Sequence, residues 1–467
     1  LTELIVTTCL TLVTGGQVSL SAGVTDLQVQ GLKYAPVSQK LSILQRLLEE
    51  KNKVYLPEIA ALLDDQVKEV RSQAAFCLVE FGDSTCLPAF RRGLNDTWWK
   101  VRLYCAQGLV KHGDGSIVPE LLRCLDDSYW QVRYYGAAGL GKFADEEVLE
   151  GLLSHLRDNN PQVVEELLWA LHRLFWRDAA RSRFKKLPEE KIRPFTDLIT
   201  NKVTAIRIRC LWAMEASQDE RVVPFLVKAL DDAEAEVQLR SLWALERLRA
   251  TQARFSIESL LENPSVKLRL ESIKTLVRLH STDTVDGLLR RLRDPDENVR
   301  IYSLWALERI REPASYPEIG QCLADSSRRV REYAASVIQS LKDAQFLPVL
   351  QNLVRDEKIP EETRVVSLQL IGALGNPSVK DFLMEEVKSE NAPLRAEAFR
   401  AWFGIDRFDR MLLKALCFAE KNDTSALVRK TASQLLKDLK TVLTRNLNSG
   451  DRTQRQQALE VAEEIID

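Results

Sequence analysis

The sequence predicts an all-α protein, a right-handed α-solenoid of about thirteen to fourteen stacked helix pairs with a period of about 31 residues. The first observation is a recurring marker, as Val70-Arg71, Val101-Arg102 and Val132-Arg133 are each 31 residues apart. The second is that Gly is scarce and no strand-like alternation persists. The third is that one helix pair has an apolar face too large to leave in water, so successive pairs must stack to bury it.

The marker continues along nearly the whole chain. Later copies are Val163-Val164, Ile206-Arg207, Val237-Gln238, Leu268-Arg269, Val299-Arg300, Val330-Arg331, Thr363-Arg364, Leu394-Arg395 and Val428-Arg429, with degenerate end copies at Gln39-Lys40 and Gln454-Arg455. This spacing predicts a degenerate N-terminal capping repeat at 1–50 and a degenerate C-terminal capping repeat at 441–467. Full repeats are predicted at 51–176 and 191–440, and they flank a basic insertion loop at 177–190.

Each unit is predicted to contain two helices. A short apolar helix comes first, as in IVPELLRCL at 117–125, and a turn with Asp or Asn follows, as at 125–127. The second helix begins at the marker, and we expect the Asp or Asn to accept hydrogen bonds from its first-turn N–H groups. The marker arginines recur beside these turns, so we expect them to form a structural ladder rather than a ligand site. They are Arg71, Arg102, Arg133, Arg207, Arg300 and Arg331.

The repeat pattern D-x-x-x-x-VR-x-x-A-A-x-A-L is clearest at 296–310 and 127–143. It resembles HEAT repeats, and more closely the short HEAT-like repeats first grouped with phycobiliprotein lyases. The resemblance covers about nine tenths of the chain. It implies the stacked helix-pair fold strongly and implies little about function, because repeat scaffolds are reused for many purposes.

Composition narrows the class of protein. The net charge of −2 argues against extensive binding of nucleic acid over the whole surface. The sequence contains no run of about 18 apolar residues, so no membrane-spanning helix is predicted. The apolar stretch at 4–16 lacks the basic leader of a signal peptide. The eight cysteines are scattered singly and form no C-x-x-C, so we expect buried free thiols and a cytoplasmic protein.

The strings LWALHRL, LWALERL and LWALERI carry an aromatic row. With the marker as slot 0 of each second helix, slots 0, 4, 7, 8 and 11 lie on one apolar arc, and slot 6 points away from it. Slot 6 holds Trp169, Trp212, Trp243 and Trp305. Slot 10 lies one turn further on and holds Lys111, Lys142, Arg173, Arg247, Arg278 and Arg309. We expect these two rows to line a concave groove for a protein partner, acidic or helical. The alternative is that each Trp packs on the next repeat as a purely structural ladder.

A second aromatic group lies at the start of two successive second helices. Its members are Trp98, Trp99, Tyr104, Tyr129, Trp130, Tyr134 and Tyr135. We expect one continuous partner-binding patch; the alternative is that Trp99 and Trp130 cap their helices. The insertion adds Arg177, Arg181, Arg183, Lys185 and Lys186, which form either a solvated basic loop or a contact with an acidic partner or phosphates.

No pattern of catalytic residues stands out. The histidines are His112, His155, His172 and His280, and none precedes a Glu as the metal-binding His-Glu pairs of HEAT-like deoxyhypusine hydroxylases require. Gly-rich phosphate loops and nucleophile elbows are not found either. We therefore expect no enzyme, no catalytic residue, no metal and no cofactor, and we interpret His172, beside Trp169, as a contact residue.

The expected function is a non-catalytic scaffold or adaptor for a protein partner. One alternative is a nucleic-acid binder, since HEAT-like alkylpurine DNA glycosylases use a basic concave face with tryptophans. Another is a phycobilin-lyase-like or chaperone-like subunit, which the resemblance implies, although no residue of this chain can be matched to that activity. The sequence makes no prediction of the oligomeric state.

Overall fold

The computed structural model describes residues 24–143, 148–179, 189–280 and 284–448, together with 451, 453–456 and 458–459. All regular structure in these ranges is helical, as the sequence predicts. The chain divides into two compact units, unit 1 (Leu1–Val222) and unit 2 (Val223–Asp467). Each unit is a stack of helix pairs, so the predicted α-solenoid of repeated pairs is confirmed.

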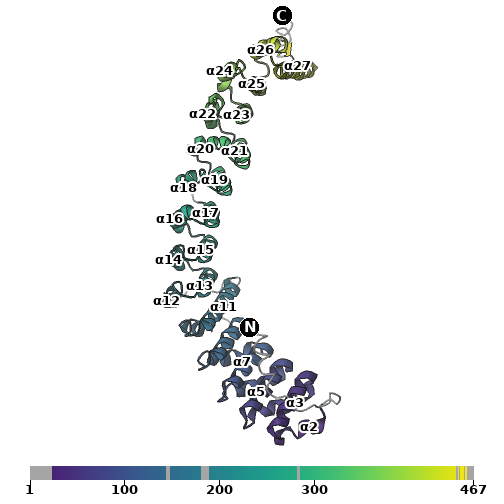
Figure 1. Cartoon of the computed structure of the whole chain (residues 1–467), viewed down its shortest axis with the longest axis vertical. Helices are drawn as coiled ribbons and strands as arrows, with labels where there is room; N and C mark the ends of the chain where they lie inside the picture. Colours follow the sequence, from purple (N-terminus) through teal and green to yellow (C-terminus); the bar gives the residue numbers. More distant parts are fainter. Residues whose placement is uncertain are drawn as a thin grey trace. The chain divides into compact units, whose positions relative to one another are not determined.

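Each pair joins a short first helix to a longer second helix (Figure 1). After α2 (Asp26–Gln30), the first helices are α4 (Leu56–Ala61), α6 (Leu87–Gly93), α8 (Val118–Cys124), α10 (Leu149–Ser154), α12 (Glu189–Leu198), α14 (Val223–Ala229), α16 (Arg254–Ser259), α18 (Val285–Arg291), α20 (Tyr316–Gln321), α22 (Leu347–Arg355), α24 (Lys380–Glu386) and α26 (Arg410–Asn422). The second helices are α3 (Val37–Glu50), α5 (Lys68–Phe81), α7 (Trp99–His112), α9 (Trp130–Phe143), α11 (Pro161–Ala179), α13 (Thr204–Ser217), α15 (Ala235–Arg247), α17 (Val266–Arg278), α19 (Glu297–Ile310), α21 (Arg328–Leu341), α23 (Glu361–Leu374), α25 (Ala392–Ile405) and α27 (Ala426–Leu447).

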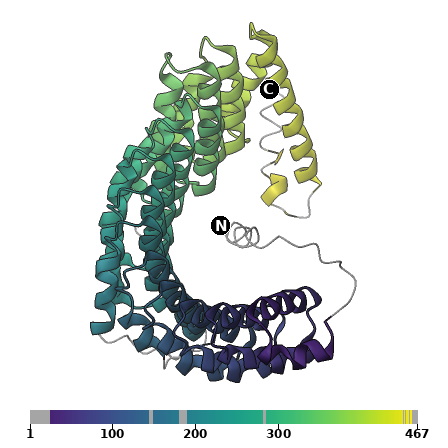
Figure 2. The same cartoon turned by 60° about the horizontal axis from the view of Figure 1, so that its bottom comes forward.

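Within each unit the helices form two layers (Figure 2). Each second helix packs against the second helix of the next pair, while the first helices form the other layer and pack on their own partners. The marker valines point into the space between the layers, and Val70, Val101, Val299 and Val330 are fully buried. Apolar burial of this kind supplies most of the free energy that holds such a stack together.

The marker arginines form the predicted ladder. Arg71 donates from Nε and Nη2 to the Asp96 carboxylate at 2.6 and 2.8 Å, and from Nη1 to the Asp65 carbonyl at 2.9 Å. Equivalent side-chain pairs link Arg102 to Asp127, Arg133 to Asp158, Arg269 to Asp294, Arg300 to Asp325 and Arg395 to Asp423. Lys40 and Asp65, 2.6 Å apart, extend the ladder to the first repeat. Arg207 and Arg331 donate to the carbonyls of Asn201 and Asp325. Each Lys–Asp and Arg–Asp pair of the ladder therefore links one repeat to the next.

The turn aspartates act one step earlier than expected. Asp65 and Asp96 accept from the backbone N–H groups of Val67 and Trp98, which precede the first residue of the following helix. The same carboxylates also accept from a Lys or Arg side chain, which holds them in the turn. True first-turn caps occur at Asp296 of α19 and at Asn391 of α25.

Two predicted boundaries differ from the helix ends. Helix α11 continues to Ala179 and α12 begins at Glu189, so the insertion drawn at 177–190 overlaps both helices. Residues 180–188, with Arg181, Arg183, Lys185 and Lys186, lie outside the described residues, as does the apolar stretch at 4–16. The boundary at 440 falls inside α27, whose Leu439 and Leu443 share one core cluster with Leu413 and Ala458.

The cysteines of the described residues carry no disulfide. Six are buried, namely Cys77, Cys86, Cys105, Cys124, Cys210 and Cys322, while Cys417 is half-buried and Cys9 lies outside the described residues. Burial raises the pKa of the Cys77 thiol to about 12, so this thiol is not a nucleophile at neutral pH. None of the described helices combines the length and the apolar character needed to cross a membrane.

Candidate partner-binding site

A cluster of aromatic side chains lies on two second helices of unit 1. Residues 169, 172, 173 and 176 follow one another at helical spacing, so they share one face of α11. Helix α13 packs beside α11 and places Trp212 next to Trp169, with ring centroids 5.7 Å apart and planes at 51°. We call Trp169, His172, Arg173, Trp176, Arg209 and Trp212 the indole cluster.

His172 lies in the middle of this cluster. Its imidazole stacks on Trp169 at 5.1 Å with the planes only 8° apart, and Trp176 lies 6.2 Å away on the other side. The His172 Nδ1 donates to the Trp212 carbonyl at 3.1 Å, a bond that ties α11 to α13. His172 therefore lies at the surface between two indoles and links α11 to α13.

Two arginines lie over the indoles. The Arg173 guanidinium is 5.2 Å from the Trp169 ring centre, and the Arg209 guanidinium is 4.9 Å from Trp169 and 4.8 Å from Trp212. Such cation–π contacts hold the side chains in place. Glu166, one turn before Trp169, is the nearby carboxylate. Burial raises its pKa, although the charges of Arg173 and Arg209 act in the opposite direction.

A cavity of about 450 Å³ opens beside the indole cluster. It is lined by Gly141, Lys142, Trp169, His172, Arg173, Trp176 and Arg177. A Cβ atom at Gly141 would lie 3.0 Å from Cα and Cβ of Ala170, so α9 and α11 approach closely at its floor. The Trp176 side chain remains 53% exposed at its rim. The lining thus combines three aromatic rings with three cations, and no described carboxylate.

Trp176, Arg209 and Glu166 were missed by the sequence reasoning. Trp176 lies seven residues after Trp169, two turns further along the same face of α11. Arg209 and Glu166 occupy slot 3, one turn before the Trp of slot 6. A search for every residue at three-, four- and seven-residue spacing from each Trp would have found all three.

In unit 2, Trp243 and its neighbours form a self-contained polar group. Trp243 is 38% exposed, and its Nε1 donates to Glu271 at 3.3 Å. Glu271 also pairs with Lys274 at 2.9 Å. Arg278 donates from Nη1 to both carboxylate oxygens of Glu246, at 2.9 and 2.8 Å. The cations beside Trp243 thus already have carboxylate partners.

Trp305 lies further along unit 2 and is half-buried. Tyr302 meets it edge-on at 6.0 Å, and the Arg309 guanidinium is 5.5 Å from its ring centre. Lys274 lies 4.9 Å from the Tyr302 ring centre, in the slot where the Trp row is interrupted. Arg247, the last residue of α15, is exposed. The predicted tryptophans thus lie on second helices, but none is as exposed as Trp176.

The second predicted aromatic group does not form one continuous patch of stacked rings. Trp99 stacks on Tyr129 at 4.9 Å and lies 6.2 Å from Trp98, whose other face is covered by the Lys68 ammonium at 4.1 Å. Tyr104 instead packs on Phe76 of α5, at 5.3 Å. Tyr134 and Tyr135 meet edge-on at 5.5 Å, and Tyr135 packs against the buried residues Ala106, Cys124 and Val132. Trp130, the first residue of α9, is half-buried. The structure therefore brings together Trp98, Trp99 and Tyr129 in one place and Tyr134 and Tyr135 in another.

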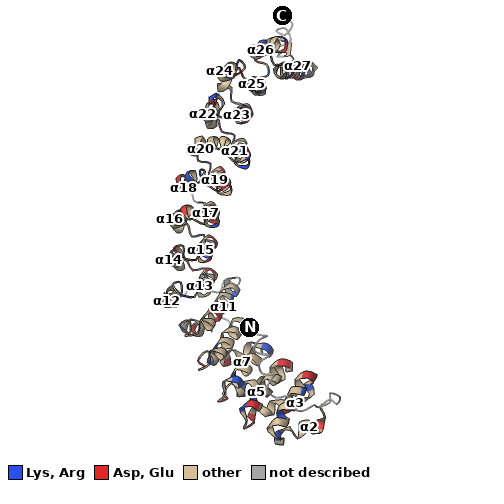
Figure 3. Cartoon of the chain, in the orientation of Figure 1, with Lys and Arg blue, Asp and Glu red and all other residues tan. Residues whose placement is uncertain are grey.

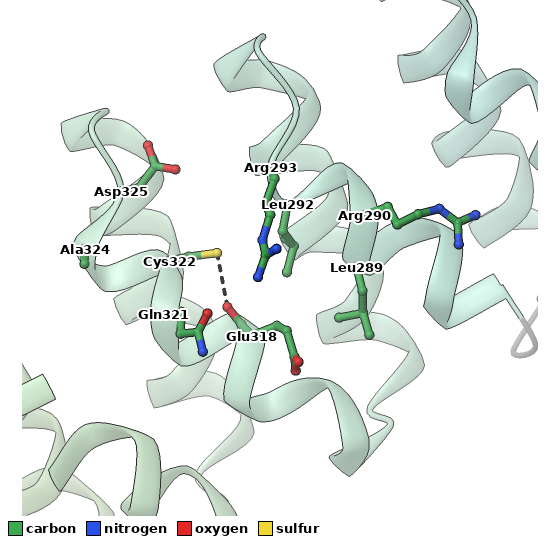
Figure 4. Close-up of a pocket in the computed structure, with 9 residues that line it drawn as sticks. All are labelled: Leu289, Arg290, Leu292, Arg293, Glu318, Gln321, Cys322, Ala324 and Asp325. Carbon is green, nitrogen blue, oxygen red and sulfur yellow. Dashed lines mark hydrogen bonds between the residues drawn. The ribbon is translucent and has the colours of Figure 1, made fainter. Parts of the chain in front are cut away.

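A further cavity of about 480 Å³ lies between α18 and α20 of unit 2 (Figure 4). In its polar lining, Arg290 pairs with Glu262 and Asp325 pairs with Arg300, whereas the buried Glu318 Oε2 has no hydrogen-bond partner among the described residues. The Cys322 Sγ donates to the Glu318 carbonyl at 3.4 Å, and burial raises the pKa of the thiol to about 12. Nothing in the sequence pattern pointed to this cavity, because it arises from the gap between two short first helices.

Among the described residues, no three His, Cys, Asp or Glu side chains come close enough together to hold a metal ion. The predicted binding residues therefore reduce to three surfaces: the indole cluster, the Trp243–Trp305 row and the Trp98–Trp99–Tyr129 edge. Of these, the indole cluster borders the cavity of about 450 Å³.

Comparison with known proteins bears on the family. The family model for HEAT repeats matches residues 56–127, 93–172, 253–327 and 316–402, together more than half of the 467 residues. The model for the PBS lyase HEAT-like repeat matches residues 206–232. No curated protein matches the sequence. A crystal structure of an engineered protein from the Northeast Structural Genomics Consortium is 16% identical, covering 88% of this chain and 99% of that chain with a TM-score of 0.32. That likeness is too low to bear on the fold or the function.

Proposed function

Because the chain belongs to the HEAT-repeat family, we propose that it is a non-catalytic cytoplasmic adaptor that binds a protein partner at the indole cluster of unit 1. HEAT-repeat families are generally non-enzymatic scaffolds that often mediate protein interactions. The face of α11 and α13 that carries the cluster points away from the core, so a partner can bind there without disturbing the stack.

The observation that carries the proposal is the exposure of Trp176 at the rim of a cavity. Its side chain is 53% exposed, yet it lies beside His172 and Arg173, which themselves rest on Trp169. Large aromatic side chains and arginines dominate the binding energy of protein interfaces, because they bury much area at low entropic cost. A pre-arranged group of this kind suits an interface core.

A nucleic-acid partner is the second candidate. Arg209 stacked on Trp169 and Trp212 resembles the aromatic and cationic platforms on which single-stranded bases stack. A nucleic-acid groove also needs a continuous basic track along the backbone. In Figure 3, the Asp and Glu positions (red) are interspersed with the Lys and Arg positions (blue) along the helices of both units. The charge distribution therefore favours a protein partner.

The test replaces Trp176 with Ala in the full chain. We expect capture of the partner from native extract to fall at least tenfold, since truncation of an interface anchor costs about 2 kcal/mol. The melting temperature should remain within about 2 °C, because an exposed side chain contributes little to folding.

Phe255→Ala is the matched control, since Phe255 lies on first helix α16 and is 67% exposed. This variant should capture the same proteins as the wild type. Capture that is unchanged in both Trp176→Ala and Trp169→Ala would reject the proposal.

A further inference from the structure

We infer that the indole cluster selects a peptide segment in which an Asp or Glu side chain lies beside a large apolar side chain. This inference rests on the proposed function and specifies the chemistry of the partner. It follows from three features of the cluster: the unfilled donors of its arginines, the charge of the cavity lining, and the apolar walls.

The donors come from Arg173 and Arg209. The guanidinium of Arg173 lies over Trp169, 5.2 Å from the ring centre, and that of Arg209 lies over Trp212 at 4.8 Å; the five N–H donors of each group lie in its own plane. Neither side chain makes a hydrogen bond or ion pair with another residue that the structure describes. In the ladder, by contrast, Arg71 and Arg102 fill their donors with carboxylates and carbonyls. A guanidinium whose N–H groups have no hydrogen-bond acceptor among the described residues is suited to a carboxylate, which it can bind through two parallel hydrogen bonds.

The charge of the cavity lining has the sign that an acidic segment needs. Lys142, Arg173 and Arg177 line the cavity, and no described carboxylate does so. Two of these cations are partly engaged: Lys142 donates to the Val110 carbonyl at 2.8 Å, and Arg177 donates to the Lys142 carbonyl at 3.2 Å. Both of these bonds go to neutral carbonyls, so they add no negative charge to the lining. Arg173 is therefore the cation expected to contact the carboxylate, and the other two add attraction at longer range.

The apolar part of the partner is set by the walls of the cavity. Trp169, His172 and Trp176 form these walls, and the volume of about 450 Å³ lies within the usual range for sites that hold a small ligand or a single large side chain. An apolar side chain in this space would cover the exposed part of Trp176 and exclude water from Arg173. A carboxylate bound beside it would then gain strength, because the local dielectric constant falls.

The experiment uses fluorescein-labelled nonapeptides and the full chain, with anisotropy as the readout. All peptides carry a central Leu-Phe pair, flanked by Glu, by Gln or by Lys, and a 20-nucleotide single-stranded DNA is the fourth probe. We expect the Glu peptide to bind at least tenfold more tightly than the Gln peptide, and the Lys peptide and the DNA more weakly still. The preference for Glu should shrink between 50 and 200 mM salt.

The variants locate the effect. Arg173→Gln should weaken binding of the Glu peptide about tenfold and leave the Gln peptide within twofold, with partial rescue in Arg173→Lys. Arg278→Gln removes the same charge from unit 2, where Arg278 is already paired with Glu246, and should leave both peptides unchanged. Arg173 is exposed, so its replacement should not affect folding.

Several results would overturn the inference. They are equal binding of the Glu and Gln peptides, equal weakening by Arg278→Gln and Arg173→Gln, or tighter binding of the DNA than of any peptide. If no peptide binds while capture from extract still requires Trp176, the acidic specificity fails and the adaptor function stands. If capture is also insensitive to Trp176, both proposals fail together.

Discussion

Units 1 and 2 place tryptophan in the same slot of their second helices, yet the two surfaces differ. In unit 1, Trp169 and Trp212 touch each other and support arginines with no carboxylate bound to them. In unit 2, the indole N–H of Trp243 is bound to Glu271, and Arg278 is bound to Glu246. On the first surface the arginines over the indoles have no hydrogen-bonded carboxylate. On the second surface Glu271 and Glu246 already accept hydrogen bonds from Trp243 and Arg278.

Slot 3 of the second helix that follows each tryptophan in the next repeat accounts for much of this difference. It holds Arg209 in α13, and that arginine stacks on the two indoles. In α17 it holds Glu271, which accepts from Trp243 and pairs with Lys274. The surroundings of Trp169 and Trp243, which share the LWAL string, therefore depend on the side chain that the next repeat places in slot 3. The comparison teaches that a repeated motif does not by itself define a repeated function.

The largest expected effect comes from Val299→Asp, which tests whether units 1 and 2 unfold independently of each other. Val299 is fully buried in unit 2, and an unpaired charge there costs more than about 4 kcal/mol. Each repeat contacts only its neighbours, so hydrogen exchange should accelerate at least 100-fold in α17, α19 and α21 and stay unchanged in α5 to α9.

Val54→Asp, at a valine that is 74% exposed, is the control for the added charge and should leave exchange unchanged throughout. Loss of protection in α5 to α9 of the Val299 variant would show one cooperative body. The tryptophan surfaces of units 1 and 2 would then belong to one unfolding unit.

A smaller effect is expected from Asp96→Asn, which tests the ladder of unit 1. Burial alone would raise the pKa of Asp96, but the hydrogen bond from Arg71 and the Trp98 N–H outweigh it and lower the pKa below the usual value near 3.9. The ionised carboxylate therefore stabilises the fold above about pH 4, and this stability is lost as the pH falls through the folded-state pKa. At pH 7 the variant should lose about 3 kcal/mol, since Arg71 remains without its carboxylate.

Urea unfolding of wild type and variant across pH checks this prediction. The two curves should differ at neutral pH and converge in acid. Asp64→Asn is the matched control in the same unit, because its carboxyl side chain is 71% exposed, and it should change the unfolding midpoint very little. A constant difference between the Asp96 variant and the wild type at all pH values would contradict the ionic origin of the ladder.

The smallest effect sharpens the contrast between the two tryptophan surfaces. Trp243→Ala should leave capture of the partner within twofold of the wild type and lower the unfolding free energy by about 1–2 kcal/mol, because it removes a half-exposed ring and its bond to Glu271. Parallel measurement of capture and of urea unfolding checks both parts. Loss of partner binding equal to that of Trp176→Ala would show that the surface around Trp243 in unit 2 also binds the partner, so that the two tryptophan surfaces would not differ in function.

Much of the fold could be predicted because it depends on local spacing. The 31-residue interval located each second helix, and the buried valines at slot 0 confirm its phase. The arginine ladder was also predictable, since Arg71 and Asp96 recur at a constant separation in later repeats. The end of α27 was not, because Leu443, beyond the predicted boundary at 440, continues the apolar face of that helix.

The candidate site was predictable only in outline. The tryptophans of slot 6 lie opposite the core, yet Trp169, Trp212 and Trp305 are half-buried rather than free. The reason is that a neighbouring helix about 10 Å away is within reach of an indole, even on the outer face. The grouping of the aromatic residues at 98–135 into separate parts likewise depends on which neighbour each ring meets.

The sequence by itself determined the helix pairs, their stacking order and the ladder, because these depend on periodicity and on residue types at constant separation along the chain. Only the tertiary structure decided which aromatic side chains remain exposed, which arginines lack a carboxylate and where a cavity opens. Those properties arise from side chains of different repeats that compete for the same space and the same charges, and spacing along one helix does not encode that outcome.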